Sequence, residues 1–341
     1  MISEKKMEKQ IKSYFERTNP LKLDYPKVLK LSRIGRGESN LNFFLATKKE
    51  NYLVRVDIIN NIKRFKQEYL ILKKLEPLKI APRVFFIDTS KKYFHENIMF
   101  TSFISGKSLD RLKKEEYMKY YPNLAKKLAK LHEKRLNFSN SIYSFEKRLE
   151  KTMKIIKKLK RDLKFIKEKE KISLLIDTYT KELKKRMKNY QQKLSFCHGD
   201  LCLGNVMLHK KEFYLIDWEV AGDLDPAFEL SYHLYEFPYT RKQRDGFLQE
   251  YLKNKEDTTL LKRMKFTNFF VAFSGYLEIL HTCFNIYNKK GHKEFLLSAD
   301  LKEYWDWGDY YLKFVIEQGS FDKDFEKKLK KELNGIYKQL I

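Results

Sequence analysis

The sequence predicts an α+β protein in which a small strand-rich part precedes a larger, mainly helical part. Between residues 29 and 106, short apolar runs bounded by turn-forming residues are typical of strands. Beyond Gly106, apolar residues recur instead at the three- and four-residue spacing of helices. The composition, 43% hydrophobic and 15% aromatic over 341 residues, is that of a folded chain long enough to bury two cores.

The first 104 residues are expected to form a helix followed by several strands, of which those at 42–46 and 51–57 form an antiparallel pair. Residues 1–19 have the pattern of a short polar helix, an extension that ends before Asn19-Pro20. Residues 20–104 carry the strands and one helix, in the sequence RFKQEYLILKKL. The strands are expected at 29–34, 42–46, 51–57, 84–88 and 97–106.

Two charged residues of this part fall at positions where charge is costly. Arg55 lies in the middle of the apolar run YLVRVD, and Glu68 lies on the apolar face of the following helix. A buried cation requires an anion, so we expect Arg55 and Glu68 to form an ion pair between strand and helix. The pair could be purely structural or could also position the phosphates of a nucleotide, and both interpretations stay open at this point.

Residues 105–341 are expected to be mainly helical. The segment YPNLAKKLAKLH is an amphipathic helix, and residues 146–194 form a lysine-rich helical hairpin with 18 basic and 7 acidic residues. Asp225-Pro226 is expected to begin a helix, with the aspartate as N-cap. Aromatic residues at helical spacing between 266 and 284 are expected to form core.

The formal net charge of +26 raises the question of an anionic partner. Because acidic residues are interspersed with the basic ones along most of the chain, we expect solvated lysine-rich faces and no nucleic-acid partner. Three cysteines in so long a chain fit a reducing compartment. With no apolar leader and no apolar run of membrane-spanning length, the sequence predicts a cytoplasmic protein without a membrane span.

The stretch FCHGDLCLGN, followed by FYLIDWE, places two acids and an amide at the ends of strand-like segments. Phosphoryl transfer from a nucleotide needs oxygen ligands for Mg²⁺ and a carboxylate that orients the attacking hydroxyl. Asp200 would then be the catalytic base, and Asn205 and Asp217 would hold the metal. His198 is expected to brace the loop beneath Asp200, and a general acid is the alternative role. Cys197, His198 and Cys202 are poorly spaced for a closed zinc site and lack a fourth ligand.

The turn GRGESN supplies a further component that phosphoryl transfer requires. Its glycines would let backbone amides approach phosphates closely, although a plain hairpin turn has the same sequence pattern.

Together these pieces resemble the aminoglycoside phosphotransferase and choline kinase family, from about Leu29 to Leu234. HGDLCLGN matches the HGDxxxxN pattern of that family, and IDWEVAGDLDPAFELS resembles its metal-binding strand and the helix that follows. IMFTSFISGKSL resembles its hinge, and LAKKLAKLH the helix ahead of the catalytic region. The resemblance implies a bilobal protein-kinase-like fold, with a small antiparallel-sheet N-lobe over 20–104 and a mainly helical C-lobe over 105–341.

The resemblance also implies an enzyme, a small-molecule kinase that transfers a phosphoryl group to an alcohol group with the help of Mg²⁺. ATP is the expected donor and GTP the alternative, because a hinge contacts the base mainly through backbone groups. Nucleotide binding is assigned to the glycine turn, the Arg55–Glu68 pair and the hinge. These residues are Gly35, Gly37, Ser39, Asn40, Arg55, Glu68, Phe100, Ser102 and Phe103.

Two departures favour small-molecule kinases over protein kinases. Arg55 stands where protein kinases carry lysine, and no activation segment with an APE-like end is present. The alternatives are a protein kinase-like activity and a basic nucleic-acid- or membrane-binding protein on a kinase-like scaffold. The joint retention of Asp200, Asn205 and Asp217 argues against a scaffold that has lost catalysis.

The expected acceptor is an amino alcohol similar to choline or ethanolamine, or else an aminoglycoside. Glu219 and Asp223 follow the metal-binding strand, where members of the family bring the acceptor. Trp305 and Trp307 lie beside acids near the C-terminus and could hold a cationic amine by cation–π contact. Ordinary loop acids and aromatic packing of a terminal helix are the alternatives for these four residues.

Overall fold

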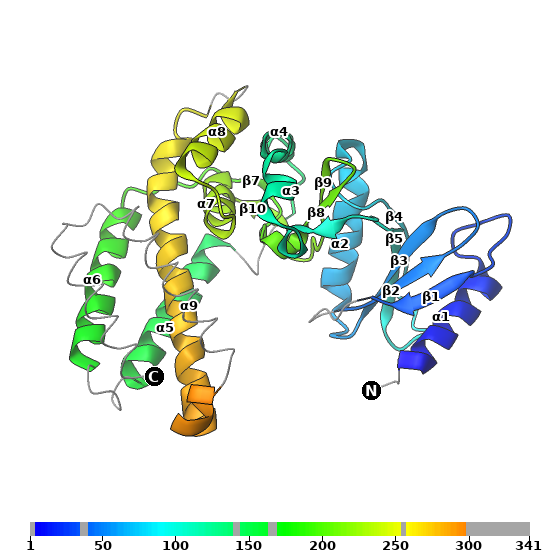
Figure 1. Ribbon diagram of the computed structural model, residues 1–341, viewed down its shortest axis with the longest axis horizontal. Helices are drawn as coiled ribbons and strands as arrows, with labels where there is room; N and C mark the ends of the chain where they lie inside the picture. The colour runs from blue at the N-terminus through cyan, green and yellow to red at the C-terminus, as the bar shows by residue number, and fades with distance from the viewer. Residues whose placement is uncertain (1–3, 35–39, 139–143, 163–168, 254–256, 298–341) are drawn as a thin grey trace. The chain divides into compact units, whose positions relative to one another are not determined.

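The computed structural model describes residues 4–34, 40–138, 144–162, 169–253 and 257–297 (Figure 1). These residues belong to two compact units that alternate along the chain. The sheet unit consists of residues 1–138, 198–222 and 241–255. The helical unit consists of residues 139–197, 223–240 and 256–341.

The sheet unit contains a five-stranded antiparallel sheet with the strand order β1-β2-β3-β5-β4. Its register places Arg55 of β3 between Asn42 of β2 and Met99 of β5. Because side chains alternate along a strand, Arg55 points to one face of the sheet and its neighbours Val54 and Val56 point to the other. The strands are β1 (Lys30–Arg33), β2 (Asn40–Ala46), β3 (Asn51–Asp57), β4 (Val84–Asp88) and β5 (Asn97–Ser102).

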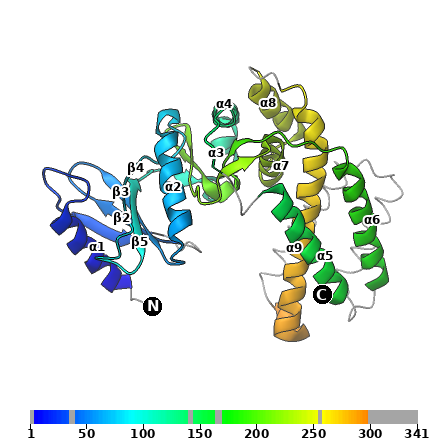
Figure 2. The ribbon, with the colours of Figure 1, turned by 180° about the vertical axis from the view of Figure 1, so that it is seen from behind.

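Helix α1 (Glu4–Thr18) covers the face to which Val54 and Val56 point (Figures 1 and 2). The predicted helix is present, but it is not polar all round. Met7, Ile11 and Phe15 are buried against residues of the sheet because they recur on one side of the helix. These side chains belong to the core of the sheet unit.

Helix α2 (Ile62–Leu75) packs on the opposite face, where Arg55 points. Asn61 is its N-cap and accepts a hydrogen bond from the backbone N–H of Arg64 at 3.2 Å. Its buried side includes Glu68 among apolar residues, as the sequence predicts. A short 3-10 turn, η1 (Glu76–Leu78), follows the helix.

In the described residues, the rest of the sheet unit holds a second, three-stranded sheet of order β6-β8-β9 and five helical segments after β5. The helix predicted at YPNLAKKLAKLH is α4, which packs against α8. The elements are β6 (Lys107–Ser108), η2 (Leu109–Arg111), α3 (Lys114–Met118), α4 (Tyr121–Leu131), η4 (Leu203–Asn205), β8 (Val206–His209), β9 (Glu212–Leu215) and α8 (Arg241–Leu252).

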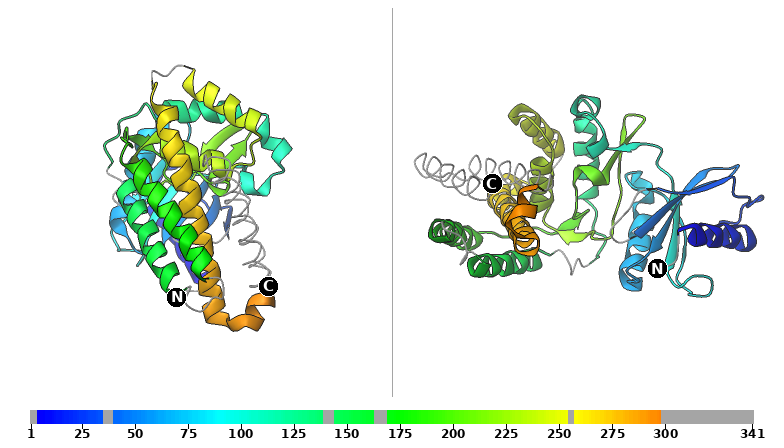
Figure 3. Two further views of the ribbon diagram at one scale, coloured as in Figure 1. Left: turned by 90° about the vertical axis from the view of Figure 1, so that its left-hand side faces the viewer. Right: turned by 60° about the horizontal axis from the view of Figure 1, so that its bottom comes forward.

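The helical unit is built around α9 (Leu260–Leu297), with α5 (Phe145–Asp162), α6 (Lys169–Met187) and α7 (Pro226–Glu236) packed against it. Figure 3 shows α5, α6 and α9 running side by side. A short strand, β7 (Ser195–Cys197), pairs with β10 (Gly222–Leu224). Within the aromatic stretch predicted as core, Phe266, Phe270 and Phe273 are buried.

The start of α7 follows the sequence prediction, whereas one residue after α6 does not. Asp225 is the N-cap of α7 and accepts a hydrogen bond from the backbone N–H of Ala227 at 2.9 Å. Pro226 occupies the first turn, where a missing N–H costs nothing. The exception is Leu194. At helical spacing after Tyr190, it is expected to continue the apolar stripe of the second helix of the hairpin, but it is 53% exposed. It lies beyond the end of α6, so the helical spacing no longer fixes its direction.

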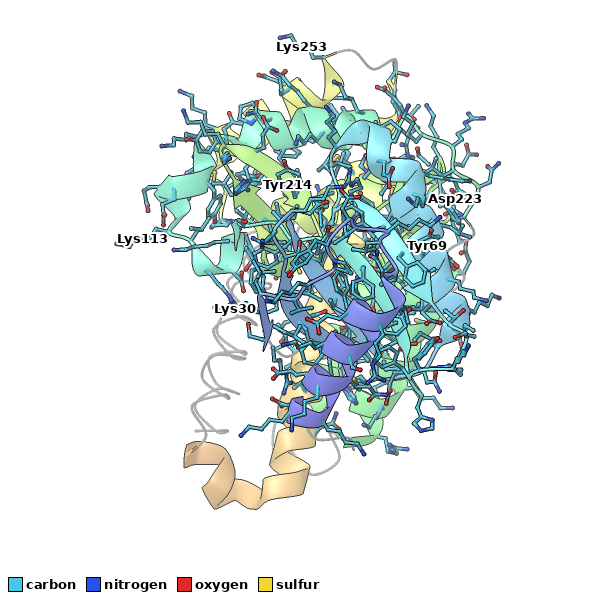
Figure 4. The ribbon with its side chains drawn as sticks, turned by 90° about the vertical axis from the view of Figure 1, so that its right-hand side faces the viewer. Lys30, Tyr69, Lys113, Tyr214, Asp223 and Lys253 are labelled. Carbon is cyan, nitrogen blue, oxygen red and sulfur yellow. The ribbon has the colours of Figure 1, made fainter. Side chains whose placement is uncertain are left out.

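Lysine side chains point outward from several elements of the sheet unit. Figure 4 shows this for Lys30 on β1, Lys113 before α3 and Lys253 after α8, all of them exposed. Among the described helices, none has both the length and the apolar character that a membrane span requires.

The packing of α1 predicts that this helix is needed for the stability of the sheet unit. Phe15 is 0% exposed and its ring contacts those of Tyr52 and Phe100. Phe15→Ala should lower the free energy of unfolding by roughly 3–5 kcal/mol, because it leaves a cavity between helix and sheet. Lys12→Ala, on the exposed side of the same helix, is the matched control and should change it by about 0.5 kcal/mol or less. Urea denaturation measures both, and equal stability of the two variants would contradict the assignment.

Candidate active site

The candidate catalytic residues all lie in the sheet unit, on the loop after β7, on the loop after β9, and on β3 and α2. The first of these loops turns sharply at Gly199, whose φ is +86°. A Cβ at this position would lie 2.7 Å from the backbone oxygen of Val220. Only glycine fits this close approach, so the G of the HGD motif fixes the path of the loop that carries Asp200.

Asn205 holds Asp200 in place. Its side-chain amide nitrogen donates to the backbone oxygen of Asp200 at 3.0 Å and to Oδ2 of the same residue at 2.9 Å. Because the nitrogen is used in this way, the amide oxygen of Asn205 is the atom left to act as a metal ligand.

His198 supports the loop from beneath and is fully buried. Its Nε2 donates to the backbone oxygen of Ile216 at 2.9 Å, and its Nδ1 accepts from the backbone N–H of Asp200 at 3.3 Å. The edge of its ring meets Trp218, with 4.5 Å between ring centroids. These contacts agree with the structural role expected from the sequence.

Asp217 follows β9 in a conformation that non-glycine residues rarely adopt, with φ +65°. The backbone N–H of Ile216, just before it, donates to the backbone oxygen of Asn205 at 3.0 Å. Oδ1 of Asp217 accepts from the guanidinium of Arg55 at 3.4 Å. This backbone bond and this side-chain contact link Asp217 to Asn205 and Arg55, so the two predicted metal ligands lie next to each other in the fold.

Arg55 and Glu68 form the predicted ion pair, with Nη1 of Arg55 donating to Oε1 of Glu68. Arg55 is 8% exposed and Glu68 is 2% exposed, so both charges are removed from water. Burial alone would lower the pKa of Arg55, but the carboxylates of Glu68 and Asp217 outweigh it and raise that pKa above its ordinary value. The guanidinium is therefore a fixed positive charge next to Asp217.

A second ion pair joins Arg64 of α2 to Glu219, two residues after Asp217. Burial, and then the nearby carboxylate of Asp217, raise the pKa of Glu219. Sequence reasoning missed Arg64. The signal was available, because Arg64 lies four residues before Glu68 and therefore on the same side of the helix.

The donor set fits a divalent cation. The carboxylates of Glu68, Asp217 and Glu219 face two arginines, Arg55 and Arg64, and the carboxylate of Asp200 adds to this excess of negative charge. Carboxylate and amide oxygens are the ligands that Mg²⁺ prefers. Asp217, whose side chain is 42% exposed, and the amide oxygen of Asn205 are the atoms best able to hold it.

The predicted hinge residues fall into two groups. The side chain of Phe100 points to the α1 face and is packed against Tyr14 and Phe15, away from Arg55. Sequence reasoning could not tell which face of the strand it occupies. Ser102 accepts a hydrogen bond from the backbone N–H of Arg83, and the ring of Phe103 meets that of Phe44 at 4.8 Å edge to face.

The other predicted residues are distributed as follows. Asn40 is buried on β2, opposite Asp57. Sequence reasoning did not single out Asp57. Its carboxylate accepts hydrogen bonds from the backbone N–H of Asn60 and from the side-chain amide of Asn97. Asp223 lies on β10, and burial raises its pKa. The remaining predicted residues lie outside the described part of the chain. They are Gly35, Gly37, Ser39, Trp305 and Trp307.

Solved structures of known proteins share this fold. A Ralstonia eutropha JMP134 protein provisionally described as an aminoglycoside phosphotransferase matches with a TM-score of 0.64 and 14% identity, over 91% of this chain and 97% of its own. Plasmodium vivax ethanolamine kinase matches at 0.59 and 16% identity, over 93% and 89% of the two chains. The choline kinase LicA of Streptococcus pneumoniae, also solved with AMP, matches at 0.56 and 20% identity, over 92% and 99%.

These neighbours confirm the predicted protein-kinase-like fold, with its five-stranded antiparallel sheet and its helical part. A comparison with curated protein sequences gives no match. The model of a family described as the phosphotransferase enzyme family matches residues 30–266, which is more than half of the chain. The chain therefore belongs to the phosphotransferase enzyme family.

Proposed function

We propose that the protein is an ATP- and Mg²⁺-dependent kinase that phosphorylates a hydroxyl group of a small molecule. The observation that carries the proposal is the arrangement of Asp200, Asn205 and Asp217 beside the buried Arg55–Glu68 pair. Membership of a phosphotransferase family and the nucleotide found in the LicA structure support it. Such a reaction fits the reducing cytoplasm expected from the few cysteines.

Asp200 is the proposed catalytic base. Asn205 orients its carboxylate through Oδ2, and this carboxylate would orient the acceptor hydroxyl and accept its proton. Mg²⁺, when bound by Asn205 and Asp217, would organise the phosphate oxygens and offset the charge that develops on them. Because the carboxylate is already fixed in the folded protein, the activation free energy does not include the entropy loss of ordering the base.

Arg55 is the proposed phosphate-binding cation. Glu68 holds one of its guanidinium nitrogens, which leaves the group oriented by the protein and independent of the ligand. The contact between Arg55 and Asp217 is long, at 3.4 Å, and can give way to a phosphate oxygen. Asn40, Ser102 and Phe103 remain part of the proposed nucleotide site. GTP is the alternative phosphoryl donor.

The proposed acceptor is an amino alcohol such as choline or ethanolamine, ahead of an aminoglycoside. Choline and ethanolamine kinases are among the similar structures. Glu219 is engaged by Arg64, so Asp223 is the better candidate for binding the amine. The overall charge of +26 disfavours a polycation more than a monocation, and the Debye length of about 8 Å at physiological salt leaves local acids to decide.

The first functional prediction concerns the base. Asp200→Asn should reduce kcat by roughly 10³-fold or more and leave the affinity for the Mg²⁺–nucleotide nearly unchanged, because it removes the proton acceptor and no phosphate contact. Asp217→Ala should instead weaken the Mg²⁺–nucleotide affinity. Single-turnover kinetics and nucleotide titration separate the two effects. A folded Asp200→Asn enzyme with full turnover would refute the assignment.

The second concerns the buried ion pair. Glu68→Ala leaves Arg55 without its nearest carboxylate, so we expect a loss of roughly 3–5 kcal/mol in the free energy of unfolding. The variant should also have a lower nucleotide affinity and a lower kcat, because Arg55 is no longer held. Glu76→Ala, which removes only an ion pair with Lys73 at the end of α2, is the control and should behave like the wild type.

The third concerns the acceptor. Comparing kcat/KM for choline, ethanolamine, a kanamycin-like aminoglycoside and a neutral sugar should rank the two amino alcohols first. Asp223→Asn should lower kcat/KM for the amines by about tenfold, because it removes the charge that pairs with the ammonium group. If a neutral sugar is phosphorylated best and Asp223→Asn leaves its rate unchanged, the amine proposal fails while the kinase proposal stands.

A further inference from the structure

A cavity of about 310 Å³ lies in the helical unit, between the end of α6 and the first turns of α9. This volume is at the lower end of the range of small-molecule sites, roughly 300–1,000 Å³. All described residues that line it belong to the helical unit, whereas Asp200, Asn205 and Asp217 belong to the sheet unit. Four of the lining residues are basic, and none of the described ones is acidic: Arg186, Lys262, Arg263 and Lys265.

Arg263 is held rigidly at this cavity. Its Nε donates to Asp225 at 2.8 Å, and its Nη2 donates to Asp257 at 2.9 Å. The hydrogen bond from Arg263 keeps the pKa of Asp257 well below its usual range. These two carboxylates neutralise Arg263, and Glu182 pairs with Arg186 at 2.8 Å, so both arginines already have anionic partners from the protein itself.

The two lysines differ from the arginines in this respect. Lys262 and Lys265 are exposed, and neither forms an ion pair with a residue that the structure describes. They lie three residues apart in the first turns of α9 and so on the same side of it. The positive end of the helix dipole adds to their charge. The cavity therefore carries an excess of positive charge from Lys262 and Lys265.

Two aromatic rings give the cavity an apolar wall beside its charged residues. The rings of Tyr190 and Phe266 lie 4.4 Å apart between centroids and line the same cavity. The hydroxyl of Tyr190 donates to Asp225 at 2.9 Å, which fixes the ring. An apolar group in the cavity could pack on this wall while an anionic group meets the lysines.

We infer that this cavity binds a compound that carries a phosphate group on an apolar portion, with Lys262 and Lys265 contacting the phosphate. Two positive charges that have no ionic partner among the described residues match the charge of a phosphate monoester. None of the described residues that line it is a proposed catalytic residue, and the inference does not depend on the proposed function. A soluble phosphate ester and the headgroup of an anionic lipid share this chemistry.

The test compares three forms of the full chain: the wild type, Lys262→Ala/Lys265→Ala, and the control Lys181→Ala/Lys184→Ala. The control removes two exposed lysines with the same three-residue spacing from α6, outside the cavity. Calorimetric titration with inorganic pyrophosphate, without Mg²⁺, should show affinity reduced by about tenfold or more in the cavity variant only. Binding elsewhere in the chain is the same in all three forms and cancels in the comparison.

Co-sedimentation with phosphatidylcholine vesicles, with and without phosphatidic acid, distinguishes the two sources of phosphate. Loss of pyrophosphate affinity alone supports a soluble ester, and an additional loss of binding to phosphatidic acid vesicles supports a lipid headgroup. If the cavity variant and the control bind both probes equally, or the wild type binds neither, the inference is wrong. Since all four substituted lysines are exposed, we expect every form to fold, and thermal unfolding checks this.

Discussion

The buried guanidinium of Arg55 is the constraint on which the sheet unit depends. A cation at 8% exposure is tolerated only where anions compensate for the lost water. Glu68 meets this need from α2, and Asp217 meets it from the loop after β9. One side chain of β3 therefore fixes the position of a helix and of a loop that lies 162 residues further along the chain. The same requirement brings the proposed phosphate-binding cation next to a proposed metal ligand.

The neighbourhood of Arg55 is not electrically balanced, and this imbalance suits a metal-dependent reaction. Four carboxylates, including that of Asp200, stand against two arginines. Asp217 also sits in a strained backbone conformation, and Gly199 passes within contact distance of Val220. Strain of this kind costs on the order of 1–3 kcal/mol per residue and persists only where the surrounding structure enforces it. Holding these carboxylates close together therefore lowers the stability of the unit, and a bound cation would reduce the repulsion between them.

The sequence predicted those parts of the fold and site that local patterns determine. Strand and helix periodicity located β2 to β5, α2 and α4, and the unexpected charges in apolar stretches identified Arg55 and Glu68 as partners. The pairing of Arg64 with Glu219 joins residues 155 positions apart in sequence, and no local pattern encodes it. Similarly, alternation along β5 defined two faces but not which one meets α1, so Phe100 could not be placed. Periodicity determines that a face is buried, whereas the partner of that face depends on the tertiary fold.

The total charge of the chain is a poor guide to the chemistry of its parts. A net charge of +26 describes a protein that contains both a carboxylate-rich site in one unit and a lysine-lined cavity in the other. Interactions between exposed charges are largely screened beyond about 8 Å at physiological salt, so each site responds to its own neighbours. Ion pairing within the protein adds to this effect. Asp225 and Asp257 neutralise Arg263, so Arg263 fixes the shape of the cavity but adds little net charge to it. What each site can bind therefore follows from which of its charges the protein leaves without a partner.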